Sequence, residues 1–155
     1  MAHIREVVDI KAPPDKVFEI LDDPEHFPQW MDGVVGVRFL SPEKHGLNSA
    51  IELTIKFGVF GFKTRAKVID YEKGYQFIIE STPGIIGTDT VEPVQGGGSR
   101  VIWDFEYEIP SAVGRIADKA VFQRLLERSA ARSLRNLKEK MEHGTIVKDQ
   151  GQVGM

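Results

Sequence analysis

Between Ser111 and Glu142 the chain contains no proline and only one glycine, Gly114. This segment can form a helix of up to about 30 residues, roughly 45 Å long at 1.5 Å per residue. Apolar residues recur along it at intervals of three or four, which predicts one continuous buried face. They are Leu126, Ala130, Leu134, Leu137 and Met141. So long a helix needs a broad apolar partner, which the rest of the chain must provide.

That partner is predicted to be a β-sheet, because most of the preceding sequence alternates between polar and apolar residues. Strands are expected over residues 3–12, 34–40, 75–81, 88–94 and 100–109, with two more in 50–69 and two short helices in 15–30. The order predicts an α+β fold, in which a curved antiparallel sheet of six to seven strands wraps around the C-terminal helix. Residues 1–142 are interpreted as one domain and residues 143–155 as a polar tail.

The strand pair in residues 50–69 is the clearest of these predictions. It flanks Gly58-Val59-Phe60-Gly61, interpreted as a four-residue hairpin loop. With that loop, Phe57 lies opposite Phe62. The remaining expected pairs are Ile55 with Thr64, Leu53 with Ala66, Ile51 with Val68, Glu52 with Lys67, Thr54 with Arg65 and Lys56 with Lys63.

Composition excludes several classes of protein. The 155 residues contain no cysteine, which removes disulfide frameworks, thiol nucleophiles, thiolate zinc sites and iron–sulfur clusters. The 20 basic and 23 acidic residues give a net charge of −3, which argues against a dedicated nucleic-acid binder, so no DNA partner is expected. The N-terminus does not resemble a signal peptide and no apolar run could span a membrane. We therefore expect a cytoplasmic protein.

Four segments carry a resemblance to a known family. They are VDIKAPPDKVFEIL at residues 8–21, FPQWM at 27–31, the hairpin at 53–68 and the helix at 110–141. Together they resemble the polyketide cyclase/dehydrase branch of the START-like, helix-grip (SRPBCC) superfamily. Residues 57–65 are similar to its Coq10-type, ubiquinone-binding subgroup. The resemblance implies a sheet that grips the C-terminal helix around a cavity for lipids, quinones, polyketides or other hydrophobic molecules.

Alternation and resemblance together select the candidate ligand-binding residues, all on the apolar face of the predicted sheet. They are Leu53, Ile55, Phe57, Phe62, Thr64, Ala66, Phe77, Ile79, Trp103, Phe105 and Tyr107. Each could instead be ordinary core. Trp103 and Tyr107 are the preferred candidates, because a buried indole N–H or phenol O–H needs a hydrogen-bond partner and can orient a ligand. Val59 and Phe60, at the hairpin tip, are candidates for a lid over the cavity or a contact with a membrane or partner.

No catalytic residue, metal ligand or cofactor site is assigned. None of the four histidines is expected on the inner face, and no zinc spacing, phosphate loop or nucleophile elbow is present. The strand acids Glu80, Asp89, Glu92 and Asp104 are expected to point outward, although a bulge would turn one inward. Thr64, Tyr107 and Arg65 are the nearest equivalents to the polar cavity residues of cyclases.

Three functions remain in competition. The first is binding or transport of a small hydrophobic ligand in a cavity between sheet and helix. The second is an enzyme of the cyclase, aromatase or dehydratase type, with catalysis considered less probable than binding alone. The third is a ribosome- or protein-interaction module. Residues 111–142 hold eight basic and four acidic residues, a surface suited to a ribosome or an anionic membrane.

Overall fold

The computed structural model describes residues 2–82, 84–108 and 119–144. Its elements are β1 (Ala2–Ile10), α1 (Pro14–Leu21), the single-turn helix η1 (Pro24–His26), α2 (Phe27–Trp30), β2 (Val34–Phe39), β3 (Ala50–Phe57), β4 (Phe60–Glu72), β5 (Gln76–Ser81), β6 (Ile85–Pro93), β7 (Ser99–Tyr107) and α4 (Lys119–Glu142). The predicted helix start at Ser111 and most of the predicted tail lie outside the described residues.

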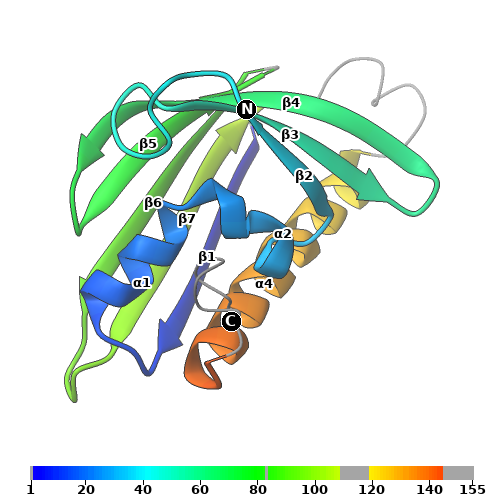
Figure 1. Ribbon diagram of the computed structural model, residues 1–155. Helices are drawn as coiled ribbons and strands as arrows, with labels where there is room; N and C mark the ends of the chain where they lie inside the picture. Colours follow the sequence, from blue (N-terminus) through cyan, green and yellow to red (C-terminus); the bar gives the residue numbers. More distant parts are fainter. Residues whose placement is uncertain (1, 83, 109–118, 145–155) are drawn as a thin grey trace.

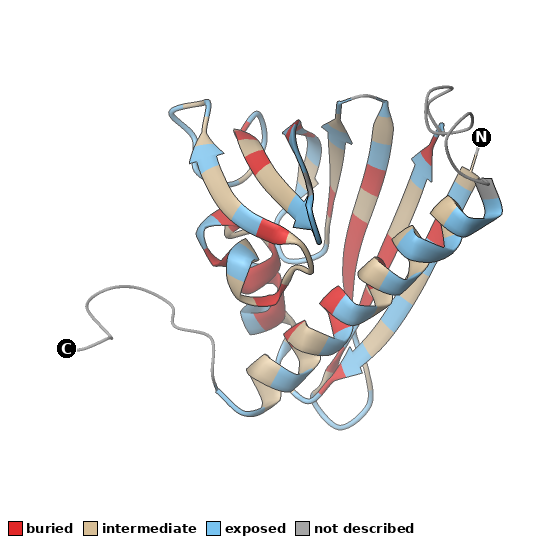
Figure 2. Cartoon of the chain, turned by 90° about the vertical axis from the view of Figure 1, so that its right-hand side faces the viewer, coloured by how far each residue is buried: buried red, intermediate tan, exposed pale blue. Residues whose placement is uncertain are grey.

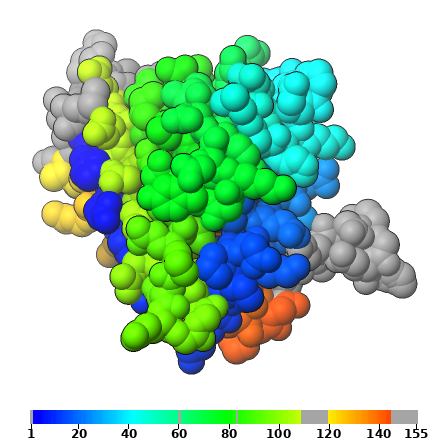
Figure 3. All heavy atoms as spheres, turned by 90° about the vertical axis from the view of Figure 1, so that its left-hand side faces the viewer, coloured from blue at the N-terminus to red at the C-terminus, as the bar shows by residue number. Residues whose placement is uncertain are grey.

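The strands form one antiparallel sheet in the order β1-β7-β6-β5-β4-β3-β2. The sheet arches over α4, which runs beneath it with α1 and α2 alongside (Figure 1). On the outer side, strands β5 and β6 form a continuous green and yellow-green surface flanked by residues 40–50 and α1 (Figure 3). The predicted α+β architecture, with seven antiparallel strands around a C-terminal helix, is therefore confirmed.

The predicted register of the β3–β4 hairpin is wrong by two residues. Phe57 pairs with Phe60, Ile55 with Phe62, Leu53 with Thr64 and Ile51 with Ala66. The turn contains only Gly58 and Val59, and Gly58 takes a left-handed φ of +62°. Two-residue turns that begin with such a glycine match the twist of the flanking strands. A shift of two residues keeps every side chain on its predicted face.

The new register changes the charge pairs on the outer face. Glu52 opposes Arg65, and Lys56 opposes Gly61, so the predicted Lys56–Lys63 pair does not form. Glu52 is only 12% exposed and lies within 4 Å of three cationic side chains. These are Arg38 at 3.2 Å and Lys63 and Arg65 at 3.9 Å each.

Irregular pairing bends the sheet. The register shifts between Val34 and Gly36 on β2, and between Val68 and Asp70 on β4. Such bulges increase local twist and bend a strand. Beyond the second one, the hydroxyl of Tyr71 donates to Asp22 Oδ2 at 2.7 Å, which ties β4 to the end of α1.

The apolar stripe of α4 is confirmed. Ala130, Leu134 and Leu137 are buried, and Leu126 and Met141 pack against the same core. Buried bands of the strands face this helix (Figure 2). Three polar contacts then fix α4 against α2 and the residues after it. Ser133 Oγ accepts from Asp32 N at 2.8 Å, Asn136 Nδ2 donates to Trp30 O at 3.2 Å, and Arg132 pairs with Asp32 at 3.4 Å.

Candidate functional site

A cavity of about 330 Å³ lies between the concave face of the sheet and the helices. Its volume is at the lower end of the range for small-molecule sites, about 300–1,000 Å³. Strands β3 to β7 supply most of its wall, α4 contributes Leu126, Ser129 and Ala130, and α2 and its flanks contribute Phe27 and Met31. The lining is mainly aliphatic and aromatic, as expected where the inner faces of strands meet a helix without filling the space between them.

All eleven side chains selected from the sequence line this cavity. They come from β3, β4, β5 and β7. Of the two residues of the predicted lid, Val59 does not line the cavity. Val59 is 94% exposed at the turn, and the side chain of Phe60 lies outside the described residues. That the wall residues contact a ligand, and that the hairpin tip closes over it, remain predictions.

The cavity reaches solvent beside the β3–β4 hairpin. Phe57 and Phe62 line it while remaining 40% and 52% exposed, and the exposed Lys63 joins them. Gly33 holds Phe57 at this edge, because a Cβ atom at Gly33 would come within 2.8 Å of the Phe57 ring. Gly33 also has a φ of +84°, which favours glycine. Two aromatic rings therefore border the entrance.

Trp103 and Phe105 line one wall of the cavity, and Trp30 packs against Trp103 without lining the cavity itself. The ring centroids of Trp30 and Trp103 are 5.6 Å apart, and those of Trp103 and Phe105 are 5.3 Å apart. Phe105 can lie there only because its partner on β6 is Gly87, whose missing Cβ leaves room for the ring. The wall is thus set by a glycine on the neighbouring strand.

Asp89 on β6 also faces into the cavity, contrary to the expectation that the strand acids point outward. It pairs with Phe77 on β5 and Trp103 on β7, and it is only 6% exposed. No bulge is needed, since simple alternation from the inward Gly87 and Val91 places it inside. The sequence hides this orientation because Thr88, Asp89 and Thr90 are all polar.

Burial raises the pKa of the Asp89 carboxyl to about 7, and the indole N–H of Trp103 opposes part of that rise. The pKa shift favours a neutral carboxyl near neutral pH. The Trp103 N–H is close enough to the carboxyl to lower its pKa, but the two groups are not aligned for a hydrogen bond, and neither Asp89 Oδ1 nor Trp103 Nε1 has a hydrogen-bond partner among the described residues. A carboxyl oxygen and an indole N–H therefore lie unpaired in the same apolar cavity.

Other polar groups on the wall already have partners. The Tyr107 hydroxyl donates to Gln123 Oε1, and Gln123 Nε2 donates to His3 O at 3.1 Å. Thr64 Oγ1 donates to Thr82 O. Tyr107 therefore ties β7 to α4 and β1, and burial, with the nearby Glu127 carboxylate, raises its pKa.

Asp22 at the edge of the cavity is partnered as well. Its carboxylate accepts from the Tyr71 hydroxyl and, at 3.3 Å, from Gly46 N. Burial raises the pKa of Asp22, while these two hydrogen bonds act in the opposite direction. Asp22 thus serves first to hold α1, β4 and the residue 46 turn together.

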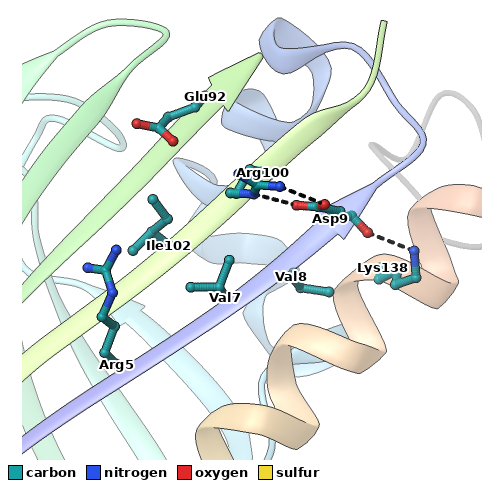
Figure 4. A pocket seen from close by; sticks show the side chains of 8 residues that line it. All are labelled: Arg5, Val7, Val8, Asp9, Glu92, Arg100, Ile102 and Lys138. Carbon is teal, nitrogen blue, oxygen red and sulfur yellow. Dashed lines mark hydrogen bonds and ion pairs between the residues drawn. The ribbon is translucent and has the colours of Figure 1, made fainter. Parts of the chain in front are cut away.

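A second, larger hollow of about 620 Å³ lies on the outer face of β1, β6 and β7. Within it the side chains of Arg100 and Asp9 pair, and Lys138 reaches the backbone of Asp9 (Figure 4). Arg100 donates to both carboxylate oxygens of Asp9, and Lys138 Nζ donates to Asp9 O at 2.7 Å. This hollow is an open surface feature in which Asp9 already pairs with Arg100, so the inner cavity is the stronger candidate site.

No group of three or more histidine or acidic side chains in the described part of the chain is placed to hold a metal ion. No helix among those residues is long and apolar enough to cross a membrane. None of the four histidines lines the cavity; His26 is buried, but beside Asp23.

The fold is that of a known protein family. Residues 1–142 match the model of the family described as polyketide cyclase/dehydrase and lipid transport. The chain belongs to this family. An uncharacterised protein of Mycobacterium tuberculosis is 27% identical over 140 residues, covering 86% of this chain and 81% of that protein.

Solved structures agree on the fold. The Thermus thermophilus protein TTHA0849 aligns with a TM-score of 0.77 and 20% identity, over 93% of this chain and 99% of that one. The Zhui aromatase/cyclase from a Streptomyces species aligns with a TM-score of 0.74 and 12% identity, over 94% of this chain and 99% of that one. The helix-grip prediction is confirmed. The likeness to the Coq10-type subgroup is not confirmed.

Proposed function

We propose that the protein binds and carries a small hydrophobic molecule in the cavity between the sheet and α4. The observation that carries this proposal is the lining itself, a 330 Å³ space walled mainly by apolar side chains. Each Å² of apolar ligand surface removed from water contributes about 25 cal/mol to binding. The family, whose description includes lipid transport, supports the same function.

The entrance supports exchange of the ligand with solvent or another carrier. Phe57 and Phe62 offer apolar surface at the border of the cavity, and Lys63 adds a positive charge beside them. A molecule entering here would meet aromatic surface before it reached Trp103 in the interior. A lipid, a quinone or a polyketide-like ring system would suit such a path.

The test is native mass spectrometry of the purified protein, followed by organic extraction. A stoichiometric hydrophobic molecule is the expected result. Ala130→Phe, which fills the cavity from α4, should abolish the bound mass. Leu125→Phe adds the same ring to the exposed side of that helix and should retain it. Equal loads in both variants, or an empty protein that takes up no added hydrophobic molecule, would contradict the proposal.

The second candidate function is catalysis of a ring closure or dehydration. One observation favours it: the buried Asp89 carboxyl, with its pKa raised to about 7, can give or take a proton near neutral pH. The Zhui structure belongs to an aromatase/cyclase of the same fold. Incubation with a poly-β-ketone thioester would test this function by mass spectrometry of the products. Turnover lost in Asp89→Asn, with ligand binding retained, would support catalysis.

No observation on the structure favours the third function, a ribosome- or protein-interaction module. The Arg124 and Arg128 side chains of α4 are accessible, as expected for the solvated flank of an amphipathic helix. Contact with a ribosome or a membrane through this flank stays a prediction. Salt-sensitive co-sedimentation with ribosomes would test it.

A further inference from the structure

We propose that Asp89 and Trp103 form a recognition site for a hydroxyl group on the cavity's ligand, and so select alcohols and phenols over hydrocarbons of the same shape. The inference rests on the proposed function, because it assigns the polar end of the molecule that the cavity binds. It starts from two unpaired polar atoms, Asp89 Oδ1 and Trp103 Nε1.

Both side chains are more than nine-tenths buried. Asp89 is 6% exposed and Trp103 is 4% exposed, and both line the cavity. They pair directly across β6 and β7, so their Cβ atoms project from neighbouring positions on the same face. Buried polar groups are nearly always hydrogen-bonded, and each one left unpaired costs about 1–3 kcal/mol. A ligand group that paired with both atoms would remove this cost.

The chemistry of the two atoms restricts what that group can be. The indole N–H only donates, so the ligand must offer an acceptor. The Asp89 carboxyl keeps acceptor capacity in both its neutral and its ionised form, so a ligand group that can also donate pairs with it in either state. A hydroxyl oxygen provides both functions at one atom. A ligand ammonium would leave the indole N–H unpaired, and a methyl group would leave both atoms unpaired.

The neighbouring polar groups do not compete for this role. Tyr107 donates to Gln123, Thr64 donates to Thr82, and Asp22 accepts from Tyr71. These contacts fix the wall. Among the described residues that line the cavity, Asp89 and Trp103 are the two with a buried side-chain atom that makes no hydrogen bond. A ligand hydroxyl placed there would lie deep inside, with its apolar body directed toward the entrance.

The experiment compares two probes of equal shape by calorimetry, β-naphthol and β-methylnaphthalene. Affinity for the hydrocarbon tests the cavity, and the ratio of the two affinities tests the hydroxyl site. We expect Trp103→Phe and Asp89→Leu each to lower the naphthol-to-methylnaphthalene ratio about tenfold, the effect of one buried hydrogen-bonding group. Asp104→Leu, the same substitution on the outer face of β7, should leave the ratio unchanged.

A second measurement remains decisive if those variants fold poorly. Tyr107 from β7 and Asp22 from the end of α1 share the cavity lining with Asp89, while β5 contributes Phe77, which pairs with Asp89, and α4 contributes Leu126, Ser129 and Ala130. Asp32, between α2 and β2, and Lys63, on β4, also line the cavity. With Asp89→Asn, neither probe's affinity should change between about pH 5.5 and 8, since the amide does not ionise in this range.

In the native protein, methylnaphthalene affinity should fall as pH rises through this range, because the hydrocarbon excludes water from an ionising carboxylate. Naphthol affinity should fall less, because its hydroxyl donates to that carboxylate. A ratio that is the same in the native protein, Trp103→Phe and Asp89→Leu, or that does not vary with pH in the native protein, would overturn the hydroxyl site. Binding of methylnaphthalene would then still support the proposed function, whereas binding of neither probe would overturn both.

Discussion

Gly87 and Phe105 face one another across β6 and β7, and a Cβ atom at Gly87 would lie only 2.5 Å from Phe105 Cε1. Real Cβ atoms do not approach a ring carbon so closely. The Phe105 ring therefore occupies the space that any other residue at position 87 would need. This glycine sets the depth of the cavity wall next to Trp103.

Gly87→Ala should therefore destabilise the protein by about 1–3 kcal/mol, the usual cost of overpacking. The displaced Phe105 ring would also reduce the cavity and weaken binding of a hydrophobic probe. Urea denaturation measures the first effect and calorimetry the second. Gly36→Ala is the matched control, because a Cβ there would lie an ordinary 3.6 Å from Thr54 Cβ. Equal effects of the two substitutions would contradict this account of Gly87.

Asp89 should make stability depend on pH. Its folded pKa, about 7, lies above the ordinary value of 3.8, so between these values the unfolded chain has lost the proton that the folded protein keeps. This contribution is fully present below about pH 4 and is lost as pH rises to about 7, a change of up to about 4 kcal/mol. Asp89→Asn should remove this slope. If denaturation series show the same dependence of stability on pH in both proteins, Asp89 does not point inward with a raised pKa.

Tyr107→Phe should lower the free energy of unfolding by about 1 kcal/mol, because it removes the hydrogen bond to Gln123 and leaves that amide oxygen without its donor. The loss would loosen the connection of β7 to α4. Tyr75→Phe, at an exposed tyrosine, is the control and should have no measurable effect. Denaturation midpoints of the two variants provide the comparison. Unchanged stability in Tyr107→Phe would argue that the hydroxyl is kept for a ligand instead.

The hairpin tip offers a test of the predicted lid. Val59→Ser should leave stability within about 0.5 kcal/mol of the native value, because the side chain is 94% exposed. If Val59 and Phe60 cover the entrance when a ligand is bound, the same change should speed ligand release. Stopped-flow displacement of bound β-naphthol measures that rate. An unchanged rate would remove Val59 from any lid.

Alternation in the sequence was enough to assign faces on β3, β4 and β7. Side chains of a strand alternate strictly, so an error of two residues in the hairpin register left Leu53, Ile55 and Thr64 on the correct face. The register itself depended on the turn. Glycines at both ends of residues 58–61 suggested a loop of four residues. In the structure Gly61 already belongs to β4, so the turn is only two residues long.

Asp89 shows the limit of that reasoning. Its two immediate neighbours on β6, Thr88 and Thr90, are polar as well, so this stretch shows no clear contrast between an apolar and a polar face. Only the pairing with Phe77 and Trp103 decides which face turns inward. An isolated acid on a strand is most often solvated, and the exception became visible only with the neighbouring strands in place.

The amino-acid sequence by itself determined the class of fold, the long helix with its buried stripe, and the set of apolar side chains that face it. These follow from local periodicity, which each segment carries independently of the others. The open cavity, its entrance at Phe57 and the unpaired Asp89–Trp103 pair were decided by tertiary structure alone. They depend on how far the curved sheet stands from α4, a distance set by many side chains packing together.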